Sequence, residues 1–250
     1  MTNKKEINAG IIVIGNEILS GRTQDTNTST ISEWLNTIGI KVMESRAIPD
    51  IEKYIIDTVN ELRNKYNYVF TTGGIGPTHD DITAKSISRA MGLIYGPHKE
   101  AMSILEKYYK SGEFNEGRQK MAWMPTKANL ILNPTSGAPG FNVENVFCLP
   151  GVPSILKAML GGINNKLIGG DPILSLSIKL RTVESEIAQS LQIIQDSNQK
   201  VDIGSYPFFK AGKLGVSLVL RSVNQSDINN CAIQIKDMIK EKKIEILEEI

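Results

Sequence analysis

Strand-like and helix-like segments alternate along residues 9–91, and this order constrains the fold more than any other feature of the sequence. The run AGIIVIG at residues 9–15 is rich in β-branched side chains, which is typical of a strand buried on both faces of a sheet. Apolar residues at helical spacing follow in residues 26–39, and Gly39 stands where that helix would end. Two more pairs complete the series, with strands expected at 40–48 and 67–72 and helices at 51–66 and 82–91. This repetition predicts right-handed crossovers and a parallel sheet with helices on both faces.

The middle of the chain has a less regular pattern. Residues 99–112 are expected to be helical, and residues 118–125 to form a short helix that ends at Pro125 and carries Trp123 in the core. The remaining elements expected here are strands at 128–134 and 145–151 and a helix at 153–160. That last helix has a proline in its first turn, where the missing N–H costs nothing.

A glycine-rich segment, GGINNKLIGGD at residues 161–171, predicts a linker near residue 165. Beyond it the patterns predict a strand at 173–181, a helix at 184–196, strands at 201–207 and 214–222, and a helix at 226–240. The terminal KEKKIEILEEI mixes charges of both signs and is interpreted as a solvated helix end. The sequence therefore predicts an α/β domain over residues 1–165 and a small α+β domain over residues 166–250.

The charge and cysteine content exclude several classes of function. A net charge of +1 provides no general attraction for nucleic acid or an anionic membrane. The two cysteines, Cys148 and Cys231, are too few for a disulfide framework and lack metal-ligand spacing. No apolar run approaches the roughly 20 residues that span a bilayer, and the amino-terminal run is too short for a signal peptide. We therefore expect a soluble, cytoplasmic protein with neither nucleic acid nor membrane as partner.

Turn-forming and polar residues follow each of five expected strands. Ligands of open parallel sheets bind beyond the carboxyl ends of the strands, so these segments are expected to line one cleft. Taken singly, every segment except the third is equally well explained as an ordinary loop. The five segments are Gly15–Glu17, Pro49–Asp50, Gly73–Asp81, Asn133–Gly140 and Pro150–Ser154.

The third segment belongs to the sequence TTGGIGPTHDDIT, which carries three glycines at Gly73, Gly74 and Gly76. It is not a P-loop, because no lysine occurs before Lys85, and His79 stands where a dinucleotide-binding fingerprint has glycine. What remains is a glycine-rich turn that leads into a helix, whose free N–H groups suit a phosphate or a related anion.

Carboxylates beside this turn would repel the same anion. One interpretation is helix capping, with Thr78 as the N-cap and Asp81 as its partner, an effect worth roughly 0.3–1 kcal/mol per group. The other is a divalent cation that neutralises the repulsion between phosphate and carboxylates. Glu17, Asp50 and either Asp80 or Asp81 come from three strand ends, as a convergent site for Mg²⁺ would require.

Four stretches resemble a known family: GNEILSGRTQDTN, TTGGIGPTHDDIT, NPTSGAPGF and LPGVPSILKAM. They are similar to the molybdopterin-binding family of MoaB, MogA and the amino-terminal part of the competence/damage-inducible protein CinA. Two further stretches, FNEGRQKMAWMP and DIGSYPFF, look like the molybdopterin-binding-like domain of FAD synthases. The resemblance implies a three-layer α/β/α sandwich with a mainly parallel sheet, and family members commonly form dimers or trimers, so a homo-oligomer is expected.

The resemblance also implies roles for individual residues. The paired catalytic aspartates of Mog-like members align with Asp50 and Asp81, and the acid of the first strand aligns with Glu17. The expected ligands of Mg²⁺, or of Mn²⁺ or Co²⁺ in its place, are Glu17, Asp50, Asp80 and Asp81. Ligand binding is expected at Gly15, Gly73, Gly74, Gly76, Thr78, Ser136, Gly137 and Ser154.

Three functions are compatible with such a site, and the sequence leaves all of them open. CinA-like and FAD-synthase-like relatives are associated with metal-dependent cleavage of nucleotide diphosphates such as ADP-ribose or FAD. The alternatives are a non-catalytic module that binds molybdopterin or a nucleotide, and a molybdopterin adenylyltransferase of molybdenum cofactor biosynthesis. Asn16 replaces a common aspartate, and Ile155 stands where many CinA relatives have glutamate.

Overall fold

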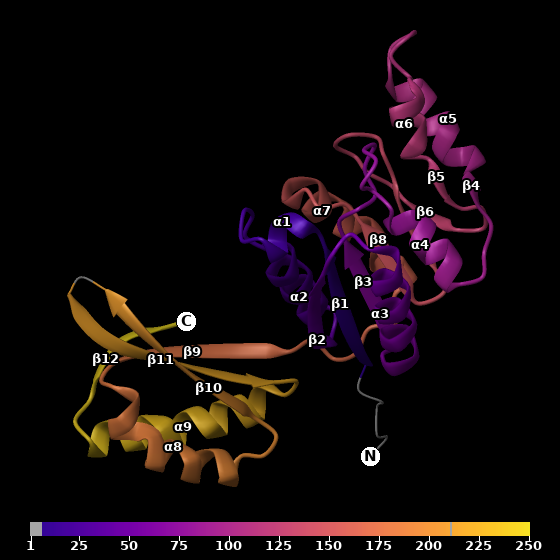
Figure 1. Cartoon of the computed structure of the whole chain (residues 1–250). Helices are drawn as coiled ribbons and strands as arrows, with labels where there is room; N and C mark the ends of the chain where they lie inside the picture. The colour runs from indigo at the N-terminus through magenta and orange to yellow at the C-terminus, as the bar shows by residue number, and fades with distance from the viewer. Residues whose placement is uncertain (1–6, 211) are drawn as a thin grey trace. The chain divides into compact units, whose positions relative to one another are not determined.

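The structure is a computed structural model that describes residues 7–210 and 212–250. The chain divides into two compact units, Met1–Gly170 and Asp171–Ile250 (Figure 1). Residues 167–170 follow the 3₁₀ helix η1 (Gly161–Lys166), and their hydrogen bonds hold them to the first unit. The Gly170 N–H donates to the Ile38 carbonyl at 3.1 Å, and the Ile168 N–H to the Tyr68 hydroxyl at 2.8 Å.

The first unit is built on a sheet with the strand order β2-β1-β3-β8-β7-β6. The strands are β1 (Ile7–Ile14), β2 (Ile40–Ile48), β3 (Tyr68–Thr72), β6 (Asn129–Ile131), β7 (Gly140–Val143) and β8 (Val146–Leu149). β2, β1, β3 and β8 pair in parallel, whereas β7 is antiparallel to both of its neighbours. β6 therefore runs in the same direction as the four parallel strands, and the expectation of a mainly parallel sheet is confirmed.

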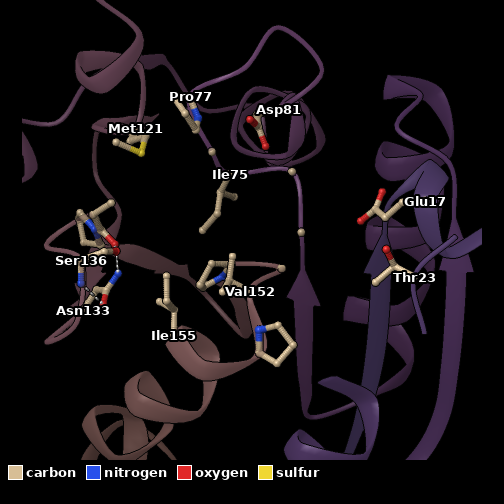
Figure 2. A pocket seen from close by; sticks show the side chains of 18 residues that line it. Glu17, Thr23, Ile75, Pro77, Asp81, Met121, Asn133, Ser136, Val152 and Ile155 are labelled. Atoms are coloured by element: carbon tan, nitrogen blue, oxygen red, sulfur yellow. Dashed lines mark hydrogen bonds between the residues drawn. The ribbon is translucent and has the colours of Figure 1, made fainter. Parts of the chain in front are cut away.

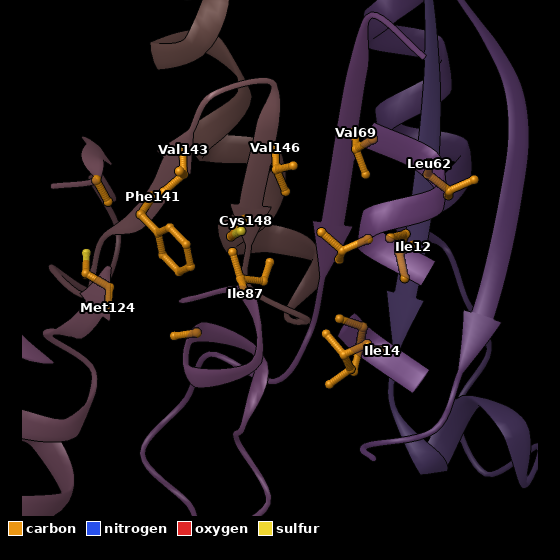
Figure 3. Packing of buried hydrophobic residues seen from close by; sticks show 14 of the residues in the cluster. Ile12, Ile14, Leu62, Val69, Ile87, Met124, Phe141, Val143, Val146 and Cys148 are labelled. Atoms are coloured by element: carbon orange, nitrogen blue, oxygen red, sulfur yellow. The ribbon is translucent and has the colours of Figure 1, made fainter. Parts of the chain in front are cut away.

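Helices cover both faces of this sheet. On one face, α3 (Glu52–Lys65) and α4 (Thr83–Ala90) pack over Ile12 and Ile14 of β1 (Figure 3). On the other face, α2 (Asn27–Thr37) and α7 (Pro153–Leu160) pack over Ile11 and Val13. Alternate residues of β1 thus enter opposite cores, which is why its residues from Ala9 to Ile14 are all apolar. The three-layer α/β/α sandwich is confirmed.

The hairpin of β7 and β8 is absent from the sequence-based expectation. Its turn consists of Glu144 and Asn145, and Glu144 has a φ of 49°. A tight turn with a positive φ is usually signalled by glycine, and no glycine occurs at these two positions. The Asn142 amide stabilises the hairpin by donating to the carbonyl of Glu144 at 2.9 Å.

A small excursion joins α4 to β6. It contains β4 (Tyr95–Pro97), α5 (Lys99–Tyr108), α6 (Glu116–Lys120) and β5 (Trp123–Pro125), and β4 pairs antiparallel with β5. The helix predicted at 118–125 is therefore wrong in its second half, because the residue before a proline favours extended backbone. Trp123 is 40% exposed rather than in the core, and its ring lies 5.6 Å from that of Tyr95.

The second unit is a four-stranded antiparallel sheet with helices on one face. Its elements are β9 (Leu174–Arg181), α8 (Glu184–Ser197), β10 (Asp202–Lys210), β11 (Lys213–Ser222), α9 (Gln225–Glu241) and β12 (Glu245–Glu249). The strand order is β10-β11-β9-β12, and the apolar residues of the strands pack against α8 and α9. The α+β class expected for this part of the chain agrees with this arrangement.

The interpretation of the carboxyl-terminal residues as a helix end is wrong. Lys243 has a φ of 53°, a left-handed conformation that ends α9. The following residues form β12, which pairs with β9. Glu245 and Glu248 then face Arg181 and Lys179 at 2.5 Å each. The mixed charges of this segment are thus cross-strand partners rather than a solvated helix surface.

Among residues 7–210 and 212–250, no helix combines the length and apolar character needed to cross a bilayer.

Candidate functional site

The carboxyl ends of the parallel strands meet at one edge of the first unit's sheet. Loops that follow β1, β3, β6 and β8 line a pocket of about 570 Å³ at this edge (Figure 2). β6 contributes because it has the same direction as β8. Glu17 comes from α1 (Asn16–Leu19), which follows β1, and Asp81 comes from the loop after β3.

Backbone geometry explains the first two glycines of the loop after β3. Gly73 and Gly74 have φ values of 101° and 67°, and a residue with a side chain adopts such values only with strain. A Cβ at Gly73 would also lie under 3.0 Å from the Ile14 carbonyl oxygen, and one at Gly74 would overlap the Thr83 side chain. The Gly73 N–H donates to the Leu149 carbonyl at 3.1 Å. The loop is therefore held tightly between the ends of β1 and β8.

The third glycine and Asp81 form the polar rim of the same loop. A Cβ at Gly76 would lie 2.7 Å from Asp81 Oδ2, so glycine leaves room for that carboxylate. Asp81 Oδ2 accepts hydrogen bonds from the Thr78 N–H at 2.7 Å and from Thr78 Oγ1 at 2.5 Å. Thr78 Oγ1 also contacts Asp80.

The capping interpretation, with Thr78 as the N-cap, is wrong, because α4 begins five residues later at Thr83. The bond between Asp81 and the Thr78 N–H has the form of a capping interaction, but it closes a separate turn ahead of the helix. The Thr83 N–H itself donates to the Gly74 carbonyl at 2.9 Å. Asp81 therefore stabilises the loop rather than the helix.

Asp50 and Glu17 form a second acidic group near the end of β1. Asp50 Oδ2 accepts a hydrogen bond from the Asn16 N–H at 2.8 Å. Burial raises the pKa of Asp50 above its ordinary value, the Asn16 bond opposes that shift, and the negative charges of Glu17 and Asp80 add to it. A Cβ at Gly15 would lie 2.5 Å from the Glu17 carboxylate, so the Glu17 side chain passes close to the end of β1.

A resident metal centre built by the protein alone does not follow from this arrangement. Across the described residues, no group of three or more histidine, cysteine, aspartate or glutamate side chains could hold a metal ion. Mg²⁺, however, is usually bound by one or two carboxylates together with phosphate oxygens and waters. Glu17 and Asp81, the two carboxylates of the pocket lining, fit that requirement when a phosphate is present.

The structure brings together some of the predicted site residues and not others. Those that line the pocket are Glu17, Gly73, Gly74, Gly76, Asp81 and Ser136. Those outside the lining are Gly15, Asp50, Thr78, Asp80, Gly137 and Ser154. Asp50 and Thr78 still act next to the pocket, through Asn16 and Asp81. The Asp80 side chain is 61% exposed and that of the neighbouring His79 is 98% exposed.

Several pocket residues were not among the individually predicted site residues, although Asn133 belongs to a segment that was expected to line the cleft. Asn133 organises the loop after β6, because its Oδ1 accepts from two backbone N–H groups and its Nδ2 donates to Ser136 Oγ at 2.6 Å. An asparagine before proline is a turn signal that identifies such a role. Met121 comes from the excursion after α4, and no sequence pattern links it to the strand ends.

The pocket has two chemically different walls (Figure 2). Glu17, Thr23 and Asp81 are its acidic and hydroxyl-bearing side. The apolar side consists of Ile75, Pro77, Met121, Ala138, Pro139, Val152, Pro153 and Ile155. Ile155, noted above as a departure from CinA relatives, is one of these apolar residues, and the polar Asn133 and Ser136 lie on the same side of the pocket (Figure 2). A ligand that fills this pocket therefore meets both polar and apolar side chains.

Lys120 approaches the glycine loop from the excursion. It is the last residue of α6, and its ammonium group donates to the Thr78 carbonyl. The hydrogen bond from Thr78 holds the pKa of Asp80 below its ordinary value, and the charges of His79 and Lys120 act in the same direction.

Comparisons with known proteins divide the chain in the same place as its two compact units. Residues 10–169 match the family model described as "Probable molybdopterin binding domain", and residues 172–248 match "FAD synthase, middle domain". A protein of Archaeoglobus fulgidus is 31% identical over 233 residues, which cover 93% of this chain and 98% of the relative.

Two further relatives are named after CinA. A CinA-like protein of Geotalea uraniireducens is 38% identical over 153 residues, but the match covers only 36% of that longer protein. A crystal structure described as the protein CinA with unknown function, from Thermoplasma acidophilum, has 32% identity and a TM-score of 0.60. It covers 64% of this chain and 96% of its own.

Proposed function

The chain belongs to the family of the probable molybdopterin binding domain, and from that premise we propose that it binds a phosphorylated pterin or nucleotide. We propose further that it hydrolyses the pyrophosphate bond of a nucleotide such as ADP-ribose or FAD. The observation that carries the proposal is the pocket itself, in which a glycine loop and two carboxylates face an apolar wall. The match of residues 172–248 to a domain of FAD synthase supports a nucleotide as ligand.

Each part of such a ligand has a counterpart in the pocket. The narrow turn at Gly73, Gly74 and Gly76 brings backbone close to the phosphates without side chains in between. Val152 and Ile155 offer apolar surface against which the ring of a pterin or a nucleobase can pack, and this packing removes the ring's apolar area from water.

The carboxylates divide the remaining work. Glu17 and Asp81 would hold Mg²⁺, Mn²⁺ or Co²⁺ together with the phosphates, and the cation supplies neutralisation of phosphate charge. Asp50 is the candidate proton acceptor, because its raised pKa makes it a stronger base than an ordinary aspartate. In that step water oxygen bonds to phosphorus, the bond from phosphorus to the bridging oxygen breaks, and the water proton passes to Asp50. The products are two phosphate monoesters, one of them AMP.

Release of AMP tests the proposal directly. Purified full-length protein is incubated with ADP-ribose or FAD and each of the three metals, and AMP is measured by chromatography. We expect turnover in the wild type and a loss of about a hundredfold or more in Asp81→Asn, the usual scale for removing a charged active-site group. Asp57→Asn is the matched control, because Asp57 pairs with Lys53 on the exposed surface of α3.

The outcomes separate the proposed hydrolase from the alternatives. Absence of AMP with every metal, together with identical behaviour of wild type and Asp81→Asn, would refute hydrolysis. Calorimetric binding of ADP-ribose, FAD or molybdopterin without turnover would instead establish a binding module.

A further inference from the structure

The described lining of the pocket carries negative charge and no positive charge, although the proposed ligand is itself an anion. Among the 18 described residues that line it, two are carboxylates and none is lysine, arginine or histidine. Asp50 and Asp80 add two more negative charges close by, since the charges of both Glu17 and Asp80 raise the pKa of Asp50. A phosphoanhydride brought into this surrounding meets repulsion from four acids, and backbone N–H dipoles alone offset only part of it.

Lys120 brings positive charge to this edge from outside the pocket lining. Its ammonium group reaches across from α6 to the carbonyl of Thr78, in the turn that also holds Asp81. The next residue, Met121, lines the pocket, and Gly117 of the same helix lies against Pro77. Both Gly117 and Lys120 of the short helix therefore lie next to the glycine loop, and Lys120 is at the end of the helix nearer to the pocket.

Lys120 has N–H donors that remain available to a ligand. A lysine ammonium group has three N–H donors, and among the described residues its acceptor is the Thr78 carbonyl. A side chain whose only role was to fasten α6 to the loop would need no charge for that bond. A charged donor held beside a phosphate cradle is what an anionic ligand requires.

We propose that Lys120 is a phosphate-binding residue, anchored on Thr78, that neutralises the phosphates of the ligand independently of any divalent metal. The inference rests on the proposed function, since it assigns a role in the same pocket. It adds a cation that comes from outside the five strand-end loops. The ligand class that it selects is a phosphate ester or anhydride over an uncharged nucleoside.

Metal-free calorimetry isolates this contribution. ADP and adenosine are titrated into full-length protein in the presence of EDTA, so that no cation other than the protein's own faces the phosphates. The variants are Lys120→Met, which keeps the length without the charge, Lys120→Arg, which keeps the charge, and Lys107→Met. Lys107 lies on the exposed surface of α5 and serves as the matched control. Circular dichroism establishes that each variant is folded.

A direct phosphate contact predicts a specific pattern. Lys120→Met weakens ADP binding by about tenfold or more, as expected for a lost hydrogen bond to a charged group, and leaves adenosine binding within about twofold. Lys120→Arg retains most of the ADP affinity, because guanidinium also binds phosphate. Lys107→Met behaves as the wild type.

Two results would overturn the inference, and they differ from failure of the proposed function. Equal weakening of ADP and adenosine by Lys120→Met would show that the lysine only holds the loop in shape. Unchanged ADP binding in that variant would show that it has no role at all. Wild-type protein that binds neither ADP nor ADP-ribose, with or without metal, would refute the proposed function itself and this inference with it.

Discussion

Replacement of Gly73 by alanine is expected to destabilise the first unit far more than the same replacement at another glycine of positive φ. Gly73 has a φ of 101°, and an added Cβ would lie under 3.0 Å from the Ile14 carbonyl oxygen at the end of β1. That oxygen belongs to the backbone of a central strand, so it cannot move aside as a flexible side chain would. Gly92→Ala is the matched control, because Gly92 has a φ of 64° but no atom within 4 Å of an added Cβ.

The magnitude follows from two separate costs. A left-handed conformation costs an L-residue about 1–2 kcal/mol, partly offset by the lower entropy of the unfolded chain, so Gly92→Ala is expected to lose about 1 kcal/mol. At Gly73 the overlap with Ile14 adds about 1–3 kcal/mol, the range found for overpacked interiors. The expected total for Gly73→Ala is therefore about 2–4 kcal/mol, a large fraction of the stability of a domain.

Tryptophan fluorescence can follow the first unit alone during urea unfolding. Both tryptophans of the chain, Trp34 and Trp123, lie in the unit Met1–Gly170. The free energy of unfolding is obtained from the midpoint and slope of that transition for wild type and both variants. A Gly73→Ala variant no less stable than Gly92→Ala would refute the claim that backbone contact with β1 requires glycine.

Three more predictions concern single side chains. Burial raises the pKa of Asp50, so the protonated form of Asp50 contributes stability that is lost as pH rises through the raised pKa. Asparagine does not titrate, so the melting temperature of Asp50→Asn relative to wild type should increase from pH 3.5 to pH 7. A constant difference would contradict this. Hydrogen bonds from Lys65, Tyr66 and Arg46 lower the pKa of Glu44 to about 2, so Glu44→Gln should lower the melting temperature at pH 7 and lose that effect as pH falls from 4.5 towards 2. Phe70 is fully buried and stacks on Phe147 at 5.1 Å, so Phe70→Ala should cost about 3–5 kcal/mol in urea unfolding, and a loss below about 1 kcal/mol would refute its place in the core.

Much of the first unit could be predicted from local patterns. The runs that became β1, β2 and β3, and the helices α2, α3 and α4, each carry the apolar periodicity of one element. Errors arose where partners distant in sequence decide the outcome. β7 needs its pairing with β8, and β12 needs β9, which supplies Lys179 and Arg181 as counter-charges.

The candidate site shows the same division. The glycines at positions 73, 74 and 76 signal a close approach of backbone, and the structure gives each of them a specific neighbour that excludes a side chain. Asp50 and Asp80 are also visible in the sequence, yet neither lines the pocket. A carboxylate at a strand end is placed by sequence only to within a loop, whereas pocket lining depends on where the side chain points.

The sequence by itself determined the α/β class, the edge of the sheet at which the pocket lies, and the glycine loop that lines it, because periodicity and glycine spacing report local backbone geometry. The tertiary structure alone decided that Met121, Val152 and Ile155 line the same pocket as Glu17 and Asp81. It also decided that Lys120 reaches Thr78 from an excursion 42 residues further along the chain. Contacts of this kind depend on how separate elements pack against one another, and no local pattern in the chain encodes that packing.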